Sequence, residues 1–252
     1  MNYTLRCRRL GRTSCREIAR LSTTGIQCIR NDAPQPEANI VFRWGCTTNV
    51  NATTIVNTAE AIHRVNDKRA FRLLLDEHEL CPATWGDLET FSEQADAAGR
   101  YIVRPAQHAQ GRNVILCNGA ADVIAACSRF PSYYISDYVE KEAEYRVCVV
   151  QGRVAWVANK IPGNPGDVAW NVARGGRFEI VRWDAWPLKA VRIAVEAFNL
   201  SGLDFGGVDI MTRGNDAYVL EINSAPSLTS PYRQEATAKC FDWIVNNGKA
   251  PI

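Results

Sequence analysis

The pattern of apolar and polar positions predicts a series of short strands and an amphipathic helix. Phe71, Leu74, Leu75 and His78 recur at i, i+3, i+4 and i+7, which predicts a helix over residues 67–79 with Asn66 as its N-cap. Short apolar or alternating runs predict strands at residues 26–29, 39–45, 101–105, 113–117, 133–139, 144–150, 154–159, 205–211 and 217–223. Because helices and strands are mixed along the chain, we expect an α/β (α+β) protein.

The first 60 residues have the pattern of a small α/β domain. Ser14 and Glu17 have the spacing of a capping box, and apolar residues follow at helical positions until Gly25. Residues 1–30 also hold seven arginines and one acid, a composition that suits a targeting presequence or a nucleic-acid-binding arm. We favour a folded helix with a solvated basic face, because a cleavable presequence would not need this structure.

Two acidic residues lie within the apolar strand pattern near the end of the chain. A turn centred on Asn215 would place Asp209 opposite Glu221 in an antiparallel pair. Facing carboxylates in apolar strands repel each other and are costly to bury, and a divalent cation removes both costs. Asn223 lies on the same face as Glu221 and offers a further oxygen. These residues predict a Mg²⁺ or Mn²⁺ site, and an exposed sheet edge is the alternative interpretation.

The composition narrows the class of protein. The 252 residues carry 29 Lys and Arg against 27 Asp and Glu, and 46% are hydrophobic, which argues against disorder, collagen and coiled coil. No apolar run approaches the roughly 18 residues that cross a bilayer, so we expect no membrane partner. Nine cysteines without a Cys-x-x-Cys pair, Cys117 and Cys148 among them, indicate reduced core thiols in a cytoplasmic protein and argue against zinc. The chain contains neither a P-loop nor a dinucleotide fingerprint.

The order of these motifs resembles the ATP-grasp superfamily, in particular its RimK-like branch, which contains the ribosomal-protein glutamate ligase. The resemblance runs from about residue 38 to residue 235. It implies an ATP-grasp fold, in which two α+β subdomains hold ATP between their sheets, preceded here by a short N-terminal α/β cap. We therefore expect a pre-ATP-grasp-like domain at residues 1–60, an N-terminal subdomain at 61–136 and a C-terminal subdomain with the Mg²⁺ site at 137–252.

The resemblance implies a role for each matching residue. Asp209, Glu221 and Asn223 match the family's Mg²⁺ ligands. The resemblance also implies the residues that bind the nucleotide. They match the family's helix-start lysine (Lys68), its phosphate-binding strand and loop (Arg104, Gln107, Gly111, Arg112), the hinge that contacts adenine (Asp137, Tyr138, Val139) and an acidic element (Glu144). The residues in register with the family's catalytic positions are Arg146, Lys160, Asn171 and Arg174.

Three features depart from the family pattern. Arg104 stands where the family has a lysine, which keeps the positive charge but changes its geometry. Ala169 stands where the branch has an arginine, so the substrate contacts there differ. The N-terminal domain is short, so its part in the acceptor pocket is reduced or supplied by a partner.

The resemblance implies ATP-dependent formation of an amide or peptide bond. ATP with Mg²⁺ or Mn²⁺ would phosphorylate a carboxylate, and an amine would attack the acylphosphate, with release of ADP and phosphate. Residues 161–170 would shield this intermediate from water. The substrates would be small molecules, peptides or a protein tail, and the chain could form a homo-oligomer. A phosphotransferase of the same fold and a catalytically decayed nucleotide-binding protein remain alternatives, whereas nucleic-acid binding rests on the basic start alone.

Overall fold

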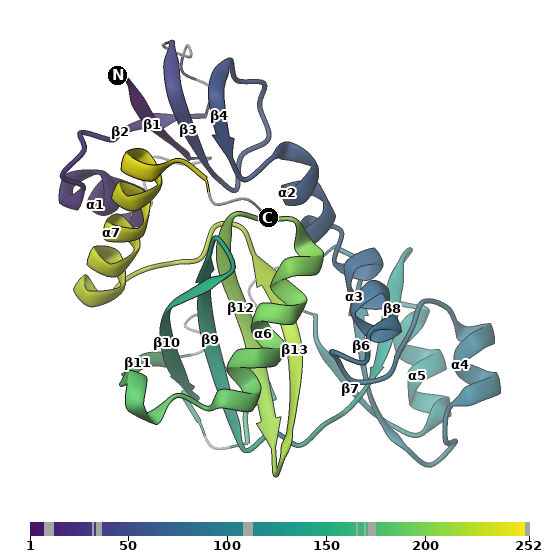
Figure 1. The fold of residues 1–252 in the computed structure, drawn as a ribbon. Helices are drawn as coiled ribbons and strands as arrows, with labels where there is room; N and C mark the ends of the chain where they lie inside the picture. Colours follow the sequence, from purple (N-terminus) through teal and green to yellow (C-terminus); the bar gives the residue numbers. More distant parts are fainter. Residues whose placement is uncertain are drawn as a thin grey trace.

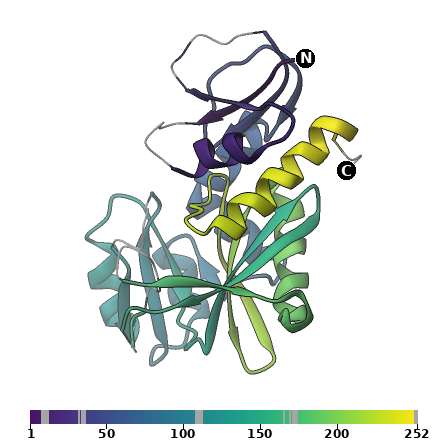
Figure 2. The ribbon, with the colours of Figure 1, turned by 90° about the vertical axis from the view of Figure 1, so that its left-hand side faces the viewer.

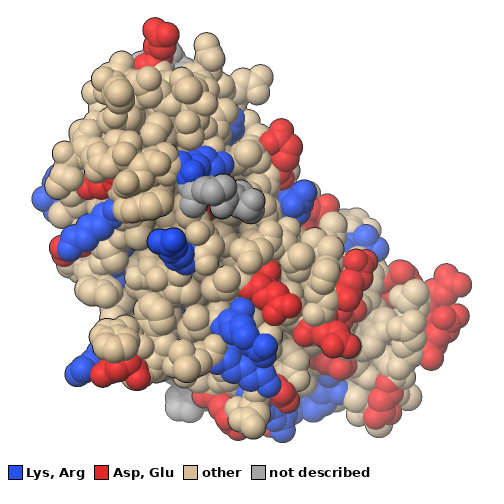
Figure 3. Space-filling model, in the orientation of Figure 1, with Lys and Arg blue, Asp and Glu red and all other residues tan. Residues whose placement is uncertain are grey.

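The computed structural model describes residues 1–7, 13–31, 33, 37–107, 113–164, 166–168, 170 and 175–249. Within these residues the strands form a four-stranded, a five-stranded and a second four-stranded sheet, each with its own helices (Figure 1). No helix in these ranges is long and apolar enough to span a membrane. On the face seen in Figure 3, basic and acidic side chains are interspersed, so the described part of this face presents no continuous basic surface.

The N-terminal sheet is parallel, with strand order β2-β1-β3-β4. Its core is shared with the end of the chain, because the ring of Phe42 stacks on that of Phe241 at 4.4 Å. Asp242 accepts hydrogen bonds from the segment that follows the first helix, including 2.5 Å from Ser22 Oγ. The elements are β1 (Tyr3–Cys7), α1 (Thr13–Leu21), β2 (Gln27–Arg30), β3 (Ala38–Trp44), β4 (Ala52–Val56) and, from the C-terminus, α7 (Pro231–Asn247).

The second sheet is antiparallel, with strand order β5-β8-β6-β7, and carries two short helices on one side (Figures 1 and 2). Trp85, Phe91 and Tyr101 form its aromatic core, with ring centroids 4.8–5.9 Å apart. The elements here, with the two helices that lead into the sheet, are α2 (Ala59–Asn66), α3 (Lys68–Glu77), β5 (Thr84–Trp85), α4 (Leu88–Gln94), β6 (Arg100–Pro105), β7 (Ile115–Asn118), α5 (Ala120–Cys127) and β8 (Tyr133–Asp137).

The five-stranded sheet is antiparallel, with strand order β11-β10-β9-β12-β13. One face packs on α6 and the other packs on α7 and the N-terminal sheet (Figures 1 and 2). Alternation along each strand therefore gives both faces a buried apolar row. The elements are β9 (Ala143–Val150), β10 (Arg153–Ile161), β11 (Arg177–Val181), η2 (Trp183–Ala185), α6 (Leu188–Ser201), β12 (Phe205–Arg213) and β13 (Asp216–Asn223).

One predicted helix cap was wrong by one residue. Asn66 is the last residue of α2, and the N-cap of α3 is Asp67, whose Oδ1 accepts a hydrogen bond of 3.0 Å from Ala70 N. The pattern of Phe71, Leu74 and Leu75 identified the helix, but it did not reveal that a second helix ends immediately before it. The predicted strands are present, and none of their ends differs from the prediction by more than two residues.

Candidate active site

Four strands of the five-stranded sheet bring the predicted catalytic and metal residues together. In the β-sheet register, Asp209 on β12 lies between Arg146 on β9 and Glu221 on β13. Lys160 on β10 completes the group, because its Nζ lies 3.5 Å from Asp209 Oδ2. These side chains share one face of the sheet, because directly paired residues of neighbouring strands point the same way and Lys160 lies two residues from Ala158, the partner of Arg146.

The predicted pairing of Asp209 with Glu221 is confirmed, although the turn differs from the one predicted. The hairpin turns at residues 214–215, half a residue from the predicted centre on Asn215. A β-bulge then shifts the register by one residue and leaves Leu220 opposite no residue of β12 in the described hairpin. The bulge restores the facing carboxylates, in keeping with the tendency of bulges to aim side chains at functional sites.

Two cations hold Asp209 in its charged form. Arg146 donates from Nε to Oδ1 at 2.6 Å and from Nη2 to Oδ2 at 2.7 Å, which is a bidentate pair. Burial alone would raise the pKa of Asp209, but Arg146 and Lys160 outweigh it and hold this pKa well below its usual range. Burial lowers the pKa of Lys160, but Asp209 and Glu144 together raise it by more than burial lowers it. The net shift is upward, so this ammonium stays charged. The group therefore combines one buried carboxylate with two fixed positive charges.

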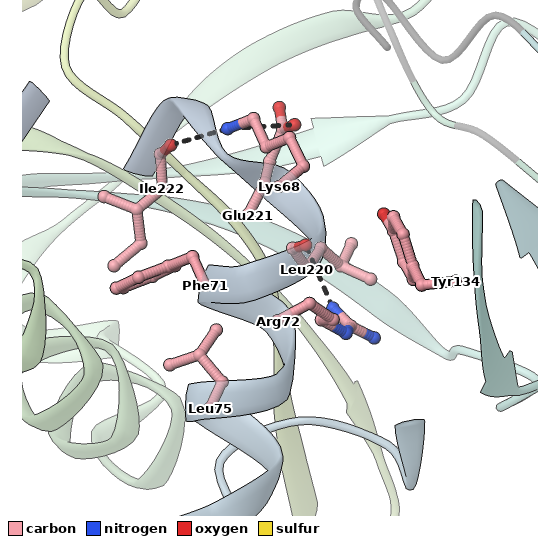
Figure 4. A pocket seen from close by; sticks show the side chains of 8 residues that line it. All are labelled: Lys68, Phe71, Arg72, Leu75, Tyr134, Leu220, Glu221 and Ile222. Carbon is pink, nitrogen blue, oxygen red and sulfur yellow. Dashed lines mark hydrogen bonds and ion pairs between the residues drawn. The ribbon is translucent and has the colours of Figure 1, made fainter. Parts of the chain in front are cut away.

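Glu221 lies beside Lys68 at the start of α3 (Figure 4), and Asn223 follows two residues later on β13. Asn223 Nδ2 donates to Glu221 Oε1 at 3.0 Å, and Lys68 Nζ lies 4.0 Å from Glu221 Oε2 while donating to Ile222 O at 3.0 Å. Burial raises the pKa of Glu221, but Lys68, the Asn223 hydrogen bond and Arg146 together lower it by more, so the net shift is downward. Lys68 also borders a small pocket between α3 and β13 that reaches Tyr134 of β8.

Cations in the first turn of α3 oppose the helix macrodipole, and the structure supplies a partner for each. Lys68 faces Glu221, as described above. Arg69 donates to Gly86 O at 3.0 Å and to Tyr133 O at 3.1 Å, which accounts for it without a bound polyanion.

The predicted nucleotide residues of the second sheet lie on β6 and β8 or directly after them. Arg104 lies near the end of β6, and its Nε is buried with no hydrogen-bond partner among the described residues. Asp137 ends β8, and burial raises its pKa. The Tyr138 amide N–H donates to Arg100 O at 2.9 Å, so it is already occupied. The remaining predicted residues in described segments are Gln107, exposed after β6, and Val139, after β8.

Four predicted site residues lie outside the described residues. These are Gly111 and Arg112 of the phosphate loop, and Asn171 and Arg174 of the catalytic stretch. Their positions stay predictions.

The donor set fits a hard divalent cation. Asp209 and Glu221 face each other in register, and Asn223 adds an amide group on the same side. No group of three His, Cys, Asp or Glu side chains that could hold a metal ion occurs in the described ranges, so the predicted set reaches three ligands only with the Asn223 amide. Two carboxylates and one amide oxygen are the ligands that Mg²⁺ prefers.

Comparison with known proteins decides the family. Residues 80–244 match the model of the RimK-like ATP-grasp domain. The chain belongs to the RimK-like ATP-grasp family. Among curated relatives, a "Probable alpha-L-glutamate ligase" of Aeromonas salmonicida is 29% identical over 187 residues, which cover 70% of this chain and 61% of that protein. A "Probable alpha-L-glutamate ligase 2" of Hahella chejuensis is 26% identical over 229 residues, covering 82% and 73%. The chain thus spans about three fifths of the first relative's length.

Solved structures confirm the ATP-grasp fold that the RimK-like resemblance implied. The ATP-grasp ligase PsnB, complexed with a minimal precursor, aligns with a TM-score of 0.69 at 12% identity over 97% of this chain and 98% of that chain. The D-alanine–D-alanine ligase of Bacillus anthracis complexed with ATP aligns with a TM-score of 0.67 at 11% identity, over 98% and 97%. At this identity the likeness concerns the fold alone.

One charged residue of this RimK-like site was missed in the sequence. Lys141 forms an ion pair with the buried Glu144, which also pairs with Lys160. Lys141 Nζ further donates to Val168 O at 3.0 Å and lies 4.5 Å from the centroid of the Trp170 ring. Burial lowers the pKa of Lys141, although Glu144 opposes the shift. Its position three residues before Glu144 was a local signal in the sequence, whereas its contacts with Val168 and Trp170 are set by the tertiary fold.

Proposed function

We propose that this chain is an ATP-dependent carboxylate–amine ligase that forms an amide or peptide bond. The observation that carries the proposal is the row of Arg146, Asp209 and Glu221 across three strands, with Lys160 and Lys68 beside it. Facing acids in such a setting suit a metal ion, and the surrounding cations suit phosphate groups. The names of the curated relatives support a ligase of this kind.

In this proposal Asp209, Glu221 and Asn223 hold Mg²⁺, which would neutralise phosphate oxygens when bound. Lys68, Arg104 and Lys160 neutralise the triphosphate, while the segment after β8 takes the adenine. The γ-phosphoryl group passes to the substrate carboxylate, so the bond to the β-phosphate breaks and ADP leaves. Arg146 then stabilises the oxyanion that forms when the amine attacks. Loss of phosphate completes the amide, and no nucleophilic side chain takes part.

Several finer assignments remain predictions. They are the use of Mn²⁺ in place of Mg²⁺, a protein tail as acceptor, a homo-oligomer, a cytoplasmic location and domain boundaries at residues 60 and 136. The relatives' names suggest L-glutamate as the first amine substrate to test.

The test is release of ADP in the presence of L-glutamate and a panel of carboxylate substrates. We expect ADP release to depend on Mg²⁺ and on both substrates together, and to be lost in Asp209→Asn. A matched control is Asp216→Asn, which changes an exposed acid of the same hairpin. ADP release that needs a hydroxyl compound and no amine would indicate a phosphotransferase instead.

A further inference from the structure

The outer face of α7 carries two large aromatic side chains that are exposed to solvent. Tyr232 is 55% exposed and Trp243 is 44% exposed. The opposite face of the helix, with Phe241 and Ile244 among its buried residues, packs into the core. Figure 2 shows α7 on the outside of the molecule, running across the side that faces the viewer. The helix therefore has apolar residues on two faces, and one of these faces is left open to solvent.

The residues on the outer face of α7 form one narrow stripe. At about 100° per residue, four of them lie within roughly 60° of arc on the helix surface, namely Tyr232, Ala236, Lys239 and Trp243. Glu235 lies at the edge of the stripe and forms an ion pair of 2.8 Å with Lys239. The stripe thus has an aromatic residue toward each end, with a small residue and one pair of opposite charges between them. Exposed aromatic residues of this kind are enriched at protein interfaces.

The stripe is complementary to itself when two copies of α7 lie antiparallel. With a twofold axis between residues 237 and 238, Tyr232 of one copy lies beside Trp243 of the partner subunit, and the reverse contact follows by symmetry. The same axis brings Glu235 to within about 1.5 Å, one helical step, of the level of Lys239 of the partner subunit. One arrangement therefore makes two aromatic pairs and two ion pairs between the copies.

The charges of the stripe favour a second copy of this chain over another kind of partner. A partner rich in one sign of charge gains little from a stripe with one acid and one base, because attraction to one of them is offset by repulsion from the other. In the antiparallel pair the four charges alternate in sign, so each acid lies near two bases. Ala236 lies close to the twofold axis, and its small side chain lets the two helix axes approach to about 8–10 Å.

We propose that this chain forms a symmetric homodimer through the outer face of α7. The proposal assigns a surface to the predicted homo-oligomer, and it does not depend on the ligase function. On its inner face, Phe241 of α7 packs on Phe42 of the N-terminal sheet and on Phe205 of the five-stranded sheet. The partner subunit therefore supports the helix that joins these two sheets.

Sedimentation velocity over a range of protein concentrations tests the proposal. The wild-type chain has a monomer mass of 28.0 kDa and should reach twice this mass as its concentration rises. Trp243→Ala should weaken dimerisation roughly tenfold or more, because aromatic residues carry much of the binding energy of an interface. Trp183→Ala is the matched control, because it removes a tryptophan that is 80% exposed but lies on η2, away from α7 in sequence. This variant should dimerise like the wild type.

An exchange of charges tests the antiparallel arrangement itself. Glu235→Lys gives a stripe with two bases, and Lys239→Glu gives a stripe with two acids. Each variant should therefore dimerise with itself at least roughly fivefold more weakly than the wild type. An equal mixture of the two variants should dimerise like the wild type, because every charge contact across the axis then joins opposite signs. The weakening in the single variants should shrink at high salt, since salt screens exposed charges.

Three results would overturn the proposal. The first is a wild-type chain that stays at 28.0 kDa at every concentration. The second is a dimer that Trp243→Ala leaves unchanged, or that Trp183→Ala weakens as much, because another face then forms the interface. The third is a mixture of the two charge variants that dimerises no better than either variant alone. The substituted side chains are all exposed, so each variant should fold, and circular dichroism checks this.

Discussion

Asp209 and Glu221 face each other in register, and each is kept charged by nearby cations rather than by solvent. Asp209 pairs directly with Arg146 and Lys160, whereas among the described residues the cation within ion-pair distance of Glu221 is Lys68, at 4.0 Å, and Asn223 adds an amide hydrogen bond. Glu221 is thus the less compensated acid and the one more free to bind a cation. This difference makes Glu221 the better residue for testing the metal site.

We predict that Glu221→Gln lowers Mg²⁺-dependent turnover by roughly a hundredfold or more. Substitution of a residue that only supports a metal ligand already lowers activity by up to about a hundredfold, and loss of a ligand should lower it at least as much. Without Mg²⁺ the free energy of unfolding should change by no more than about 1 kcal/mol, because relief of repulsion from Asp209 offsets the loss of the long Lys68 pair. Chemical denaturation with and without Mg²⁺ measures this. A sharp loss of stability without Mg²⁺ would mean that Glu221 has a structural role.

Arg104 tests whether a guanidinium replaces the family's lysine. Its buried Nε has no hydrogen-bond partner among the described residues. Burial is the main cause of the lowered pKa of Lys141, and the positive charge of Arg104 lowers this pKa further. We predict that Arg104→Ala weakens binding of an ATP analogue roughly tenfold to a hundredfold, and that Arg104→Lys restores most of it. Titration with a fluorescent nucleotide gives both numbers. Unchanged affinity in the alanine variant would show that Arg104 points away from the nucleotide.

At the scale of elements, local patterns gave most strands and the carboxylate hairpin, because a two-residue period is visible in sequence. Three features depend on the tertiary fold and were not predictable. The bulge at Leu220 arises in the packed sheet. There the buried Arg72 donates from Nη1 to the carbonyl oxygens of Val219, at 2.7 Å, and Leu220, at 3.0 Å. Lys141 acquires its role from residues 27 positions away, and Arg233 is buried by strands that lie far from it in sequence.

The segment at residues 161–170 is predicted to be a lid, and its described part contacts the base of β9 through Lys141. We predict that amide hydrogen exchange across this segment slows when an ATP analogue and the amine substrate are both present. Lys141→Gln should make exchange faster in the free protein, because the contacts to Val168 and Trp170 are lost. Lys189→Gln, an exposed lysine, is the control. Full protection in the free wild-type protein would exclude a moving lid.

At the scale of the whole molecule, the N-terminal sheet touches the segment that follows the predicted metal ligands. Gly45, at the end of β3, has a positive φ of 68°, and a Cβ there would lie 2.8 Å from Ala225 Cβ. Phe241 of α7 packs on Phe42 and Phe205, so the C-terminal helix joins this sheet to the five-stranded one. The short N-terminal domain is therefore part of the packing around the site.

Gly45→Ala tests this contact. We predict a loss of about 2–4 kcal/mol in the free energy of unfolding, from backbone strain and overpacking together, and a lower turnover. Gly152→Ala is the matched control, because its φ of 70° imposes a similar strain but nothing lies within 4 Å of its Cβ position. It should lose about 1–2 kcal/mol and keep its turnover. Equal effects of the two variants on turnover would show that the contact with Ala225 does not matter for the site.

The most direct test of the central claim is a mass spectrum of the products formed from ATP, Mg²⁺, candidate carboxylates and a pool of amino acids. A carboxylate–amine ligase gives a new species with the mass of the two substrates less one water, together with one ADP and one phosphate per bond. The species should be absent in Glu221→Gln. A phosphorylated product that persists, or conversion of ATP to AMP, would contradict the account.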